Sequence, residues 1–512
     1  MQAARPSVPA AGAALWTTRI DRKSPVPLGR QLAAALRRDI AAGALAAGAR
    51  LPSTRALATE LGLARSTVVG VFEQLTAEGY IAAAQGSGHF VPPREDAPAS
   101  AAAARPASDT PRLLARQASL LRAHVLPRRG RPRPFELGFA EVDGRFMTTW
   151  KRLASRALSG RSRLEWSYGD PQGEPPLRAA IAEYLAAARG VRCRPEQIVL
   201  TGGTQQGLSL TARILLDPGS TAWVEDPCYR AAYDIIRTAE AEIVPVPVDA
   251  DGLDIAGAPA GGTTPRLLYT TPSRQYPLGM AMPLPRRHDL LDWAAHEGVW
   301  VVEDDYESEF QRPAAALPAL QGLDRAGRVI YLGTFSKLLF PSLRLGYAVL
   351  PEDLVAPFTA ARHLTDRQSS GLVQAIMTDF ILEGHFARHL KRMRAHYAER
   401  QEFLRELIGR RLGGLLETRP AESGMYLVAW LPRGWDDRAV ATHLAAAGIT
   451  ATPLSGLSLA ARRPAALVLG YAGHEEAAMQ RAVERMTYVL ENETGLVMMT
   501  EGELASAGGA AW

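Results

Sequence analysis

The sequence is poor in the features that mark secreted and membrane proteins. Its 512 residues include two cysteines, Cys193 and Cys228, whose spacing is not that of metal ligands. A disulfide framework and a zinc site are therefore implausible, and a reducing compartment fits. No run of roughly 18 uncharged apolar residues is present, as a membrane helix would need. Residues 1–15 lack the basic start and continuous apolar core of a secretory signal, so we expect a cytoplasmic protein.

The net charge of +5 is distributed unevenly along the chain. Residues 1–133 carry +11, which leaves −6 on the remainder. Because Lys and Arg supply much of the affinity for nucleic acid by neutralising phosphate, we expect the basic part to meet a polyanion. Basic linkers that bind nothing are common, so the charge alone does not establish DNA binding.

Length and composition indicate several folded units. A chain of this length, 47% apolar, can form two or three domains. The segment Pro92–Pro134 is rich in Ala, Pro and Arg, which is typical of a tether, although residues 113–126 could form a short helix. We expect a first domain at 16–92, a linker at 93–133, a second domain at 134–492 and a frayed tail at 493–512.

The second domain has the pattern of a doubly wound α/β sheet. Short apolar or β-branched runs alternate there with helical stretches, and this alternation favours strands connected by helices. The expected strands are residues 197–200, 221–224, 242–246, 267–270, 299–302, 329–332 and 345–350.

The first domain has the pattern of two helices joined by a tight turn, with a helix before them. Residues 28–42 have apolar side chains at fourfold spacing, and Ser53 can cap a helix over 54–61. Arg65 or Ser66 then starts a helix through Glu78, whose inner face is Val68, Val71, Phe72 and Leu75. Residues 80–83 and 89–91 can pair as a small wing. Such a second helix enters a major groove with its N-terminal residues nearest the DNA.

Four motifs in this domain resemble the GntR-type winged helix over Pro25–Val91. They are LPSTRALA at 51–58, LGLARSTV at 61–68, EGY at 78–80 and GSGHFV at 86–91. The resemblance implies DNA contacts from Arg55, Arg65, Ser66 and Thr67, and a wing backbone near phosphate at Gly86, Ser87 and Gly88. Val69 stands where some relatives carry a basic residue, so base recognition can differ. The alternative is a helical adaptor with surface arginines.

A lysine follows one expected strand directly. Residues 329–332 lead into GTFSK at 333–337, and Arg344 lies a few residues later. Lys337 is suited to form an imine with an aldehyde cofactor, while the hydroxyls and Arg344 hold a phosphate. A solitary lysine at such a place is usually only solvated, so its neighbours decide the interpretation.

Two further motifs follow expected strands, where ligands bind in open α/β sheets. The motif EDDY at 303–306 follows the expected strand 299–302 and contains Asp304 and Tyr306. Asp304 lies 33 residues before Lys337. A buried carboxylate can pair with a protonated pyridine nitrogen, and a tyrosine hydroxyl can hold the ring oxygen. LTGGTQQG at 200–207 opens a helix whose N–H groups can receive phosphate, although a glycine turn alone is weak evidence.

Together these motifs resemble fold-type I aminotransferases, and with the winged helix they resemble the MocR branch of the GntR regulators from Pro25 to about Leu490. The resemblance implies pyridoxal 5'-phosphate (PLP) as cofactor and a smaller α+β part after the large sheet. Lys337 would bind the cofactor covalently, Asp304 would pair with the ring nitrogen and Tyr306 would hold the ring oxygen. The implied phosphate site is Gly203, Thr204, Gln205, Thr334, Ser336 and Arg344.

Two further tyrosines are assigned by the same resemblance. Tyr229, in EDPCY at 225–229, matches the residue that stacks on the cofactor ring. Tyr168, in YGDPQG at 168–173, matches a tyrosine that reaches the phosphate of the neighbouring subunit, which implies a homodimer. Ordinary core packing is the alternative for each aromatic side chain.

Two departures bear on enzymatic activity. Aminotransferases generally have Asn-Pro-Thr-Gly where this chain has YPLG at 276–279, so Tyr276 replaces the asparagine beside the ring oxygen. The strand expected to carry the arginine for a substrate carboxylate, ALVLGY at 466–471, has none. Possible substitutes are Arg230, Arg274, Arg462 and Arg463. The effector therefore need not be an ordinary α-amino acid.

Three functions remain open on the sequence. The first is a PLP-dependent transcription regulator that binds operator DNA and senses an amine, an amino acid or PLP. The second is an active aminotransferase with an attached DNA-binding domain, and the third is a PLP-binding module without either activity. For the regulator, an aminotransferase-type half-reaction stays open, and we do not expect full transaminase turnover.

Overall fold

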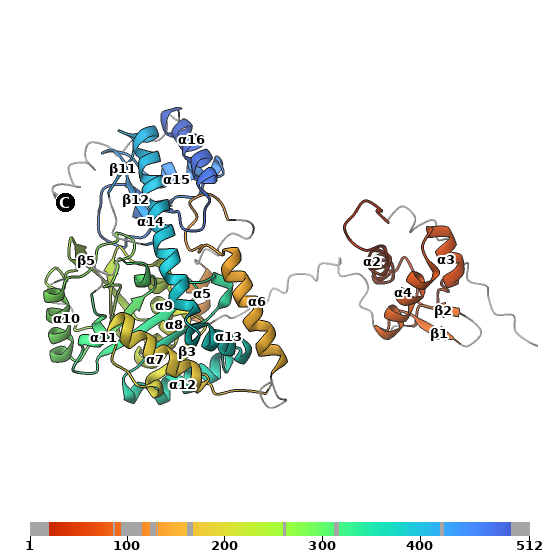
Figure 1. Ribbon diagram of the computed structural model, residues 1–512, viewed down its shortest axis with the longest axis horizontal. Helices are drawn as coiled ribbons and strands as arrows, with labels where there is room; N and C mark the ends of the chain where they lie inside the picture. Colours follow the sequence, from red (N-terminus) through yellow and green to blue (C-terminus); the bar gives the residue numbers. More distant parts are fainter. Residues whose placement is uncertain are drawn as a thin grey trace, which may run out of the picture. The chain divides into compact units, whose positions relative to one another are not determined.

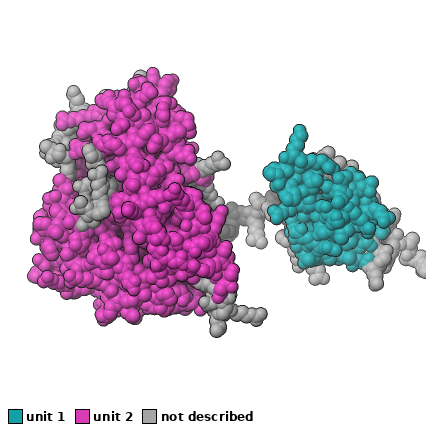
Figure 2. Space-filling model, in the orientation of Figure 1, with its two compact units in different colours: residues 1–113 teal, residues 114–512 magenta. Residues whose placement is uncertain are grey.

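The computed structural model describes residues 20–84, 88–93, 115–122, 130, 132–160, 167–259, 263–311, 317–419 and 424–492. The chain divides into two compact units, residues 1–113 and residues 114–512, which Figure 2 colours separately. We call them unit 1 and unit 2. The domain limits expected from composition stay predictions. In the described part of the chain, no helix is long and apolar enough to cross a membrane.

Unit 1 contains the expected pair of helices with a tight turn between them (Figure 1). The side chain of Ser53 accepts a hydrogen bond from the N–H of Ala56 at 3.1 Å, and Gly62 ends the helix with φ 61°. The expected inner face of the next helix is buried. The elements are α2 (Leu28–Ala41), α3 (Thr54–Leu61), α4 (Arg65–Ala77), β1 (Ala82–Ala84) and β2 (Gly88–Phe90).

The two strands of the wing in unit 1 have different bounds from the expected ones. Strands β1 and β2 are antiparallel and pair Ala82 with Phe90. Tyr80 and Ile81 do not pair, because their N–H groups donate to Leu75 O and continue the end of α4. Val91 instead donates its N–H to Ala49 O. The strands expected at 80–83 and 89–91 were therefore misplaced by one or two residues.

Unit 2 is built on an eight-stranded sheet in the order β3-β10-β9-β8-β7-β4-β5-β6. Neighbours are parallel except for the pairings of β10 and of β6. All seven strands expected from the sequence are present. The strands are β3 (Ile198–Thr201), β4 (Thr221–Asp226), β5 (Glu242–Asp249), β6 (Gly252–Leu253), β7 (Leu267–Thr270), β8 (Trp300–Asp305), β9 (Val329–Thr334) and β10 (Gly346–Val349).

Both faces of this sheet are covered. Ile198 and Leu200 pack in one apolar core, and Val199 between them packs in another. Because successive side chains of a strand point to opposite faces, a sheet buried on both sides needs continuous apolar runs. The helices are α6 (Gly144–Ser159), α7 (Pro175–Arg189), α8 (Thr204–Leu215), α9 (Arg230–Thr238), α10 (Leu284–Glu297), α11 (Leu320–Leu323), α12 (Glu352–Asp366) and α13 (Gly371–Leu382).

A smaller α+β part follows the long helix α14 (His385–Leu412) (Figure 1). Its four-stranded antiparallel sheet has the order β11-β12-β14-β13. The remaining elements are β11 (Glu417–Thr418), β12 (Tyr426–Trp430), α15 (Asp437–Ala446), β13 (Thr452–Pro453), β14 (Ala466–Gly470) and α16 (Glu476–Asn492). Short 3-10 helices are η2 (Pro195–Gln197), η3 (Ser308–Phe310), η5 (Pro341–Leu343) and η6 (Leu454–Gly456).

The expected tether contains a helix. The helix anticipated within 113–126 is α5 (Arg116–Arg122), and it packs in unit 2 against α9.

Candidate cofactor and DNA sites

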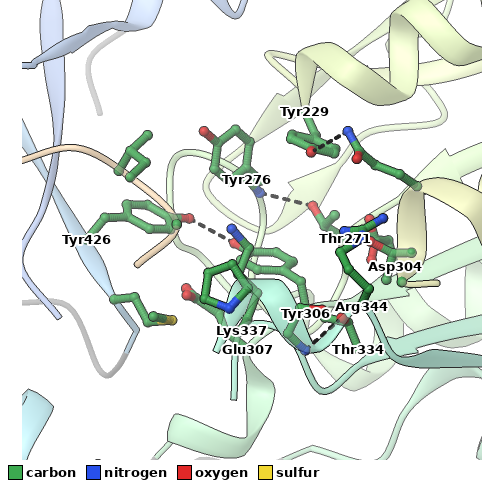
Figure 3. Close-up of a pocket in the computed structure, with 18 of the residues that line it drawn as sticks. Tyr229, Thr271, Tyr276, Asp304, Tyr306, Glu307, Thr334, Lys337, Arg344 and Tyr426 are labelled. Carbon is green, nitrogen blue, oxygen red and sulfur yellow. Dashed lines mark hydrogen bonds between the residues drawn. The ribbon is translucent and has the colours of Figure 1, made fainter. Parts of the chain in front are cut away.

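A cavity of about 330 Å³ lies where β8 and β9 end and α8 begins (Figure 3). This is the carboxyl edge of the parallel strands, where open α/β sheets bind ligands. Every predicted cofactor residue except Tyr168 lines it. These residues are Gly203, Thr204, Gln205, Tyr229, Tyr276, Asp304, Tyr306, Thr334, Ser336, Lys337 and Arg344.

Lys337 follows β9 and reaches the cavity. Burial lowers the pKa of its amine, and the negative charges of Glu307 and Asp304 oppose that effect. A lowered pKa increases the unprotonated fraction, which is the form that attacks an aldehyde. Gly138, with φ 90°, lies against this amine. Any other residue there would place its Cβ 2.8 Å from Lys337 Nζ, so the glycine leaves the amine room.

Asp304 is buried at the end of β8 and is only partly satisfied. Its Oδ2 accepts a hydrogen bond from the hydroxyl of Tyr269 at 2.7 Å, whereas Oδ1 has no hydrogen-bond partner among the described residues. Burial raises the pKa of Asp304 to about 7, and the bond from Tyr269 opposes the shift. A buried carboxylate oxygen with no partner is costly unless a bound cation completes it. A protonated pyridine nitrogen fits this requirement.

Three chain segments converge on a second polar corner of the cavity. A Cβ at Gly203 would lie 3.7 Å from Arg344 Nη1 and 3.8 Å from Thr334 Oγ1. Gly203 has φ 115° and ψ 174° just before α8, a conformation essentially restricted to glycine, and Arg344 has φ 49°. The hydroxyl of Ser336 is buried there without a partner among the described residues. A helix N-terminus, hydroxyls and a guanidinium together suit a phosphate, so the residues present fit PLP.

Tyrosines form the other side of the cavity. The ring of Tyr276 makes edge contacts with Tyr229, Tyr306 and Tyr426 at centroid distances of 5.8, 6.0 and 5.6 Å. Gln205 Nε2 donates to the hydroxyl of Tyr229 at 3.1 Å, and the hydroxyls of Tyr306 and Tyr426 lie 2.8 Å apart. Burial raises the pKa of Tyr229 and of Tyr426 to about 12, so both keep their protons.

The sequence did not single out four of the polar side chains that line the cavity: Tyr269, Thr271, Glu307 and Tyr426. Tyr269 and Thr271 lie at the end of β7. The expectation that ligand-binding residues follow the strands, which led to Asp304, could also have led to them. Glu307 is three residues beyond Asp304. Tyr426 had no sequence signal, because it comes from β12, far from Lys337 along the chain.

Tyr168 and the proposed substitute arginines lie elsewhere. The Tyr168 side chain is 73% exposed, with the guanidinium of Arg367 3.9 Å from its ring centroid. Arg230 pairs with Asp234 at 3.5 Å, and Arg274 pairs with Glu307. None of Arg230, Arg274, Arg462 and Arg463 lines the cavity.

In unit 1, the predicted DNA-contacting residues lie on the surface of the helix pair. Arg55 on α3 and Arg65 and Ser66 at the start of α4 are exposed, Thr67 is half-buried, and Gly88 is exposed in the wing. Gly86 and Ser87 lie outside the described residues. Arg50, which the sequence did not indicate, lies beside the wing, since a Cβ at Gly88 would lie 3.6 Å from its Nε.

Comparison with known proteins matches both units. Residues 28–91 match the family model of bacterial regulatory proteins, gntR family, and residues 136–486 match that of aminotransferase class I and II. The chain is 38% identical over 497 residues to the probable rhizopine catabolism regulatory protein MocR of Rhizobium meliloti, covering 96% of this chain and 99% of that protein. The chain belongs to the MocR-type branch of the GntR family.

A second regulator and a solved aminotransferase structure are also similar to this chain. The pyridoxine biosynthesis transcriptional regulator PdxR of Corynebacterium glutamicum is 30% identical over 454 residues, 88% of this chain and 93% of that protein. The crystal structure of LysN, an alpha-aminoadipate aminotransferase from Thermus thermophilus complexed with N-(5'-phosphopyridoxyl)-L-leucine, matches at a TM-score of 0.64 and 29% identity. It covers 70% of this chain and 92% of that chain.

These findings confirm the fold class and PLP as the cofactor of this MocR-type chain. They also favour the regulator over the active aminotransferase, because the relatives matched over nearly the whole chain are named as regulators.

Proposed function

We propose that this protein regulates transcription by binding operator DNA through unit 1 and by sensing an amine, an amino acid or PLP in the cavity of unit 2. The observation that carries the proposal is the pair of unpartnered polar atoms, Asp304 Oδ1 and Ser336 Oγ, beside Lys337 in a chain that also has a GntR-type domain. Since such a regulator acts on chromosomal DNA, the cytoplasm is its expected compartment.

The residues of the cavity divide the cofactor between them. PLP supplies an aldehyde that condenses with primary amines and a ring that withdraws electrons. Lys337 would bind the aldehyde carbon, and Asp304 would hold a proton on the ring nitrogen. Gly203, Thr334, Ser336 and Arg344 would bind the phosphate. The predicted stacking by Tyr229 and ring-oxygen contacts from Tyr276 and Tyr306 belong to the same proposal.

The exposed aromatic ring of Tyr168 supports a twofold homodimer. It lies at the surface and does not line the cavity of its own chain. We propose that it reaches the cofactor phosphate of the partner subunit. A dimer would also present two copies of unit 1 to two half-sites of an operator.

Helix α5 provides a physical connection between the cavity and the chain that leads to unit 1. Gln117 Nε2 donates to Thr238 O at 2.8 Å, and Arg237 Nη2 donates to Leu120 O at 3.0 Å. Thr238 and Arg237 end helix α9, and Tyr229, which lines the cavity, caps its beginning. A movement of Tyr229 would therefore shift the helix on which α5 rests.

We expect operator affinity to depend on the state of the cavity. A ligand changes an equilibrium only through different affinities for its two states, and such coupling is typically about 1–3 kcal/mol, or roughly 5–150-fold. An operator would first be selected from random-sequence DNA with the full chain. Titrations with the apo, PLP-loaded and amine-treated protein at fixed salt and protein concentration then give the coupling.

The same titration tests the connection through α5. Arg237→Ala should reduce the difference between the three states while leaving the cofactor spectrum unchanged. Arg266→Ala is the matched control, because Arg266 also donates to a backbone carbonyl, Leu215 O, but does not contact α5. If three superimposable wild-type curves were obtained, with spectra confirming the three states, unit 2 would not control unit 1.

A second test concerns the DNA contacts themselves. Replacing Arg65 or Arg55 by alanine should weaken operator binding by about 1–3 kcal/mol if each contacts a base edge, because the wrong or missing partner costs that much. Arg38→Ala removes the same charge from an exposed position at the end of α2 and should have a smaller effect. Binding at wild-type affinity by both variants across a salt series would contradict the winged-helix interface.

A further inference from the structure

The charges around the cavity are unevenly placed. The cations among its described lining residues are Lys337, which binds the aldehyde, and Arg344, which lies at the phosphate corner. The lining also includes a carboxylate, Glu307, which lies beside Lys337 (Figure 3) and is ion-paired with Arg274. Because Lys337 binds the aldehyde and Arg344 lies at the phosphate corner, an anionic group of a ligand would meet no further cation among the described lining residues.

Arg274 does not change this balance. Its Nε lies 2.5 Å from Glu307 Oε1, its Nη2 donates to Tyr426 O at 3.3 Å, and its guanidinium stacks 4.7 Å from the Tyr426 ring centroid. A Cβ at Gly424 would lie 2.5 Å from its Cζ, so the guanidinium is enclosed behind the wall. Arg274 thus positions Glu307 and Tyr426, and its charge is already paired.

The rest of this wall is apolar with phenolic hydroxyls. Tyr426 and Val468 belong to one buried cluster, against which Leu137, Tyr276 and Tyr306 pack. A carboxylate desolvated against such a surface loses its water without gaining a charged partner, and that loss is unfavourable. Aliphatic, aromatic or hydroxylated groups incur no such penalty.

Resting on the proposed function, we propose that the effector is a primary amine that carries no carboxylate next to the amino group. The amine is needed because the cavity is built around an aldehyde-binding lysine. The wall of tyrosines, with Glu307 and Arg274 paired to each other, offers an anion no unpaired cation among the described residues. Glu307 is a specificity-determining residue for this choice, and Arg274 is a positioning residue.

The test uses pairs of probes that differ only in the carboxylate. Tyramine is compared with tyrosine, ethanolamine with serine, and 1,4-diaminobutane with ornithine, by titrating the visible spectrum of the PLP-loaded full chain. The same pairs are titrated against free PLP. The affinity ratio of each pair on the protein is then divided by its ratio with free PLP, which removes the intrinsic reactivity of the amine. We expect at least one pair to favour the amine by roughly tenfold or more, the equivalent of about 1.4 kcal/mol. Equal affinity, or preference for the amino acid in every pair, would overturn the proposal.

Substitution of Glu307 tests whether this residue causes the preference for amines over amino acids. Glu307→Gln removes the negative charge and leaves Arg274 without its ion partner, so the preference for the amine should fall and amino acids should bind more tightly. The double variant Glu307→Gln with Arg274→Met removes both charges of the pair, so it should keep the preference for the amine and show that the released Arg274 causes the change in the single variant. Glu309→Gln is the control, since Glu309 is a buried glutamate that does not line the cavity. An unchanged preference in the folded Glu307→Gln protein, or a lost preference in the double variant, would refute the role of Glu307.

The result is separable from the proposed function. Operator titration with apo and PLP-loaded protein requires no amine, so a difference between those two states supports the regulator whichever probes bind. Identical operator affinity in every ligand state would contradict the regulator, even if the spectra showed the expected preference for amines.

Discussion

Replacing Lys337 by alanine should abolish covalent attachment of PLP and the visible absorption band that accompanies it. Among the described residues that line the cavity, Lys337 is the only primary amine. The contacts at Asp304, Ser336 and Arg344 do not involve this amine, so the variant should still bind PLP reversibly. Spectra before and after borohydride reduction, followed by mass analysis of the peptides, measure the loss.

A matched lysine variant separates this effect from loss of charge. Lys391 is exposed on α14, and Lys391→Ala should keep the absorption band and the reduced adduct on the peptide with Lys337. A covalent adduct that survived in the Lys337→Ala protein would show that another amine binds the aldehyde, and the assignment of the cavity would be wrong.

Replacing Asp304 by asparagine should stabilise the cofactor-free protein at neutral and alkaline pH. Burial raises the pKa of Asp304 from the ordinary 3.8 to about 7. Between pH 4 and 7 the folded protein therefore holds a proton on Asp304 that the unfolded chain has lost. The contribution of Asp304 to the free energy of unfolding falls as the pH rises through this range, and it is constant above about pH 7. Asparagine can still accept the hydrogen bond from Tyr269 and does not titrate.

The expected gain for the apo Asp304→Asn protein at pH 8 is on the order of a few kcal/mol, since one pKa unit corresponds to about 1.4 kcal/mol. It should shrink towards zero near pH 4.5. Urea unfolding across this range measures it. Burial raises the pKa values of Glu303 and Glu309 to about 7 as well, and both titrate in the two proteins, so the difference isolates Asp304.

Adding PLP should reverse the order of the two proteins. A protonated ring nitrogen pairs with the Asp304 carboxylate and not with an amide, so PLP should stabilise the wild type more than the variant. Equal pH slopes for the two apo proteins would mean that Asp304 does not carry the buried charge. An equal response to PLP would mean that it does not meet the ring.

The sequence by itself indicated two folded units and most of the residues that line the cavity. Strands buried on both faces must be continuously apolar, so runs such as 267–270 and 329–332 were visible without a structure. Ligands bind at the carboxyl ends of parallel strands. The polar residues that follow such runs, among them Asp304 and Lys337, could therefore be predicted to lie together in a ligand site. In unit 1, Ser53 and Gly62 bounded a helix by capping chemistry that depends on neighbouring residues alone.

Only the tertiary structure decided which side chains form the wall of the cavity around Glu307 and Tyr426. Arg274, Glu307 and Tyr426 come from three separated segments. Their ion pair and ring contact make a candidate carboxylate-binding arginine one half of a buried pair behind the wall. The end of the second wing strand, where Val91 N–H donates to Ala49 O, and the contact of α5 with α9 likewise depend on segments far apart in the sequence. Local patterns specify which face of an element is buried. Which charges meet across elements depends on side-chain positions that no single segment encodes.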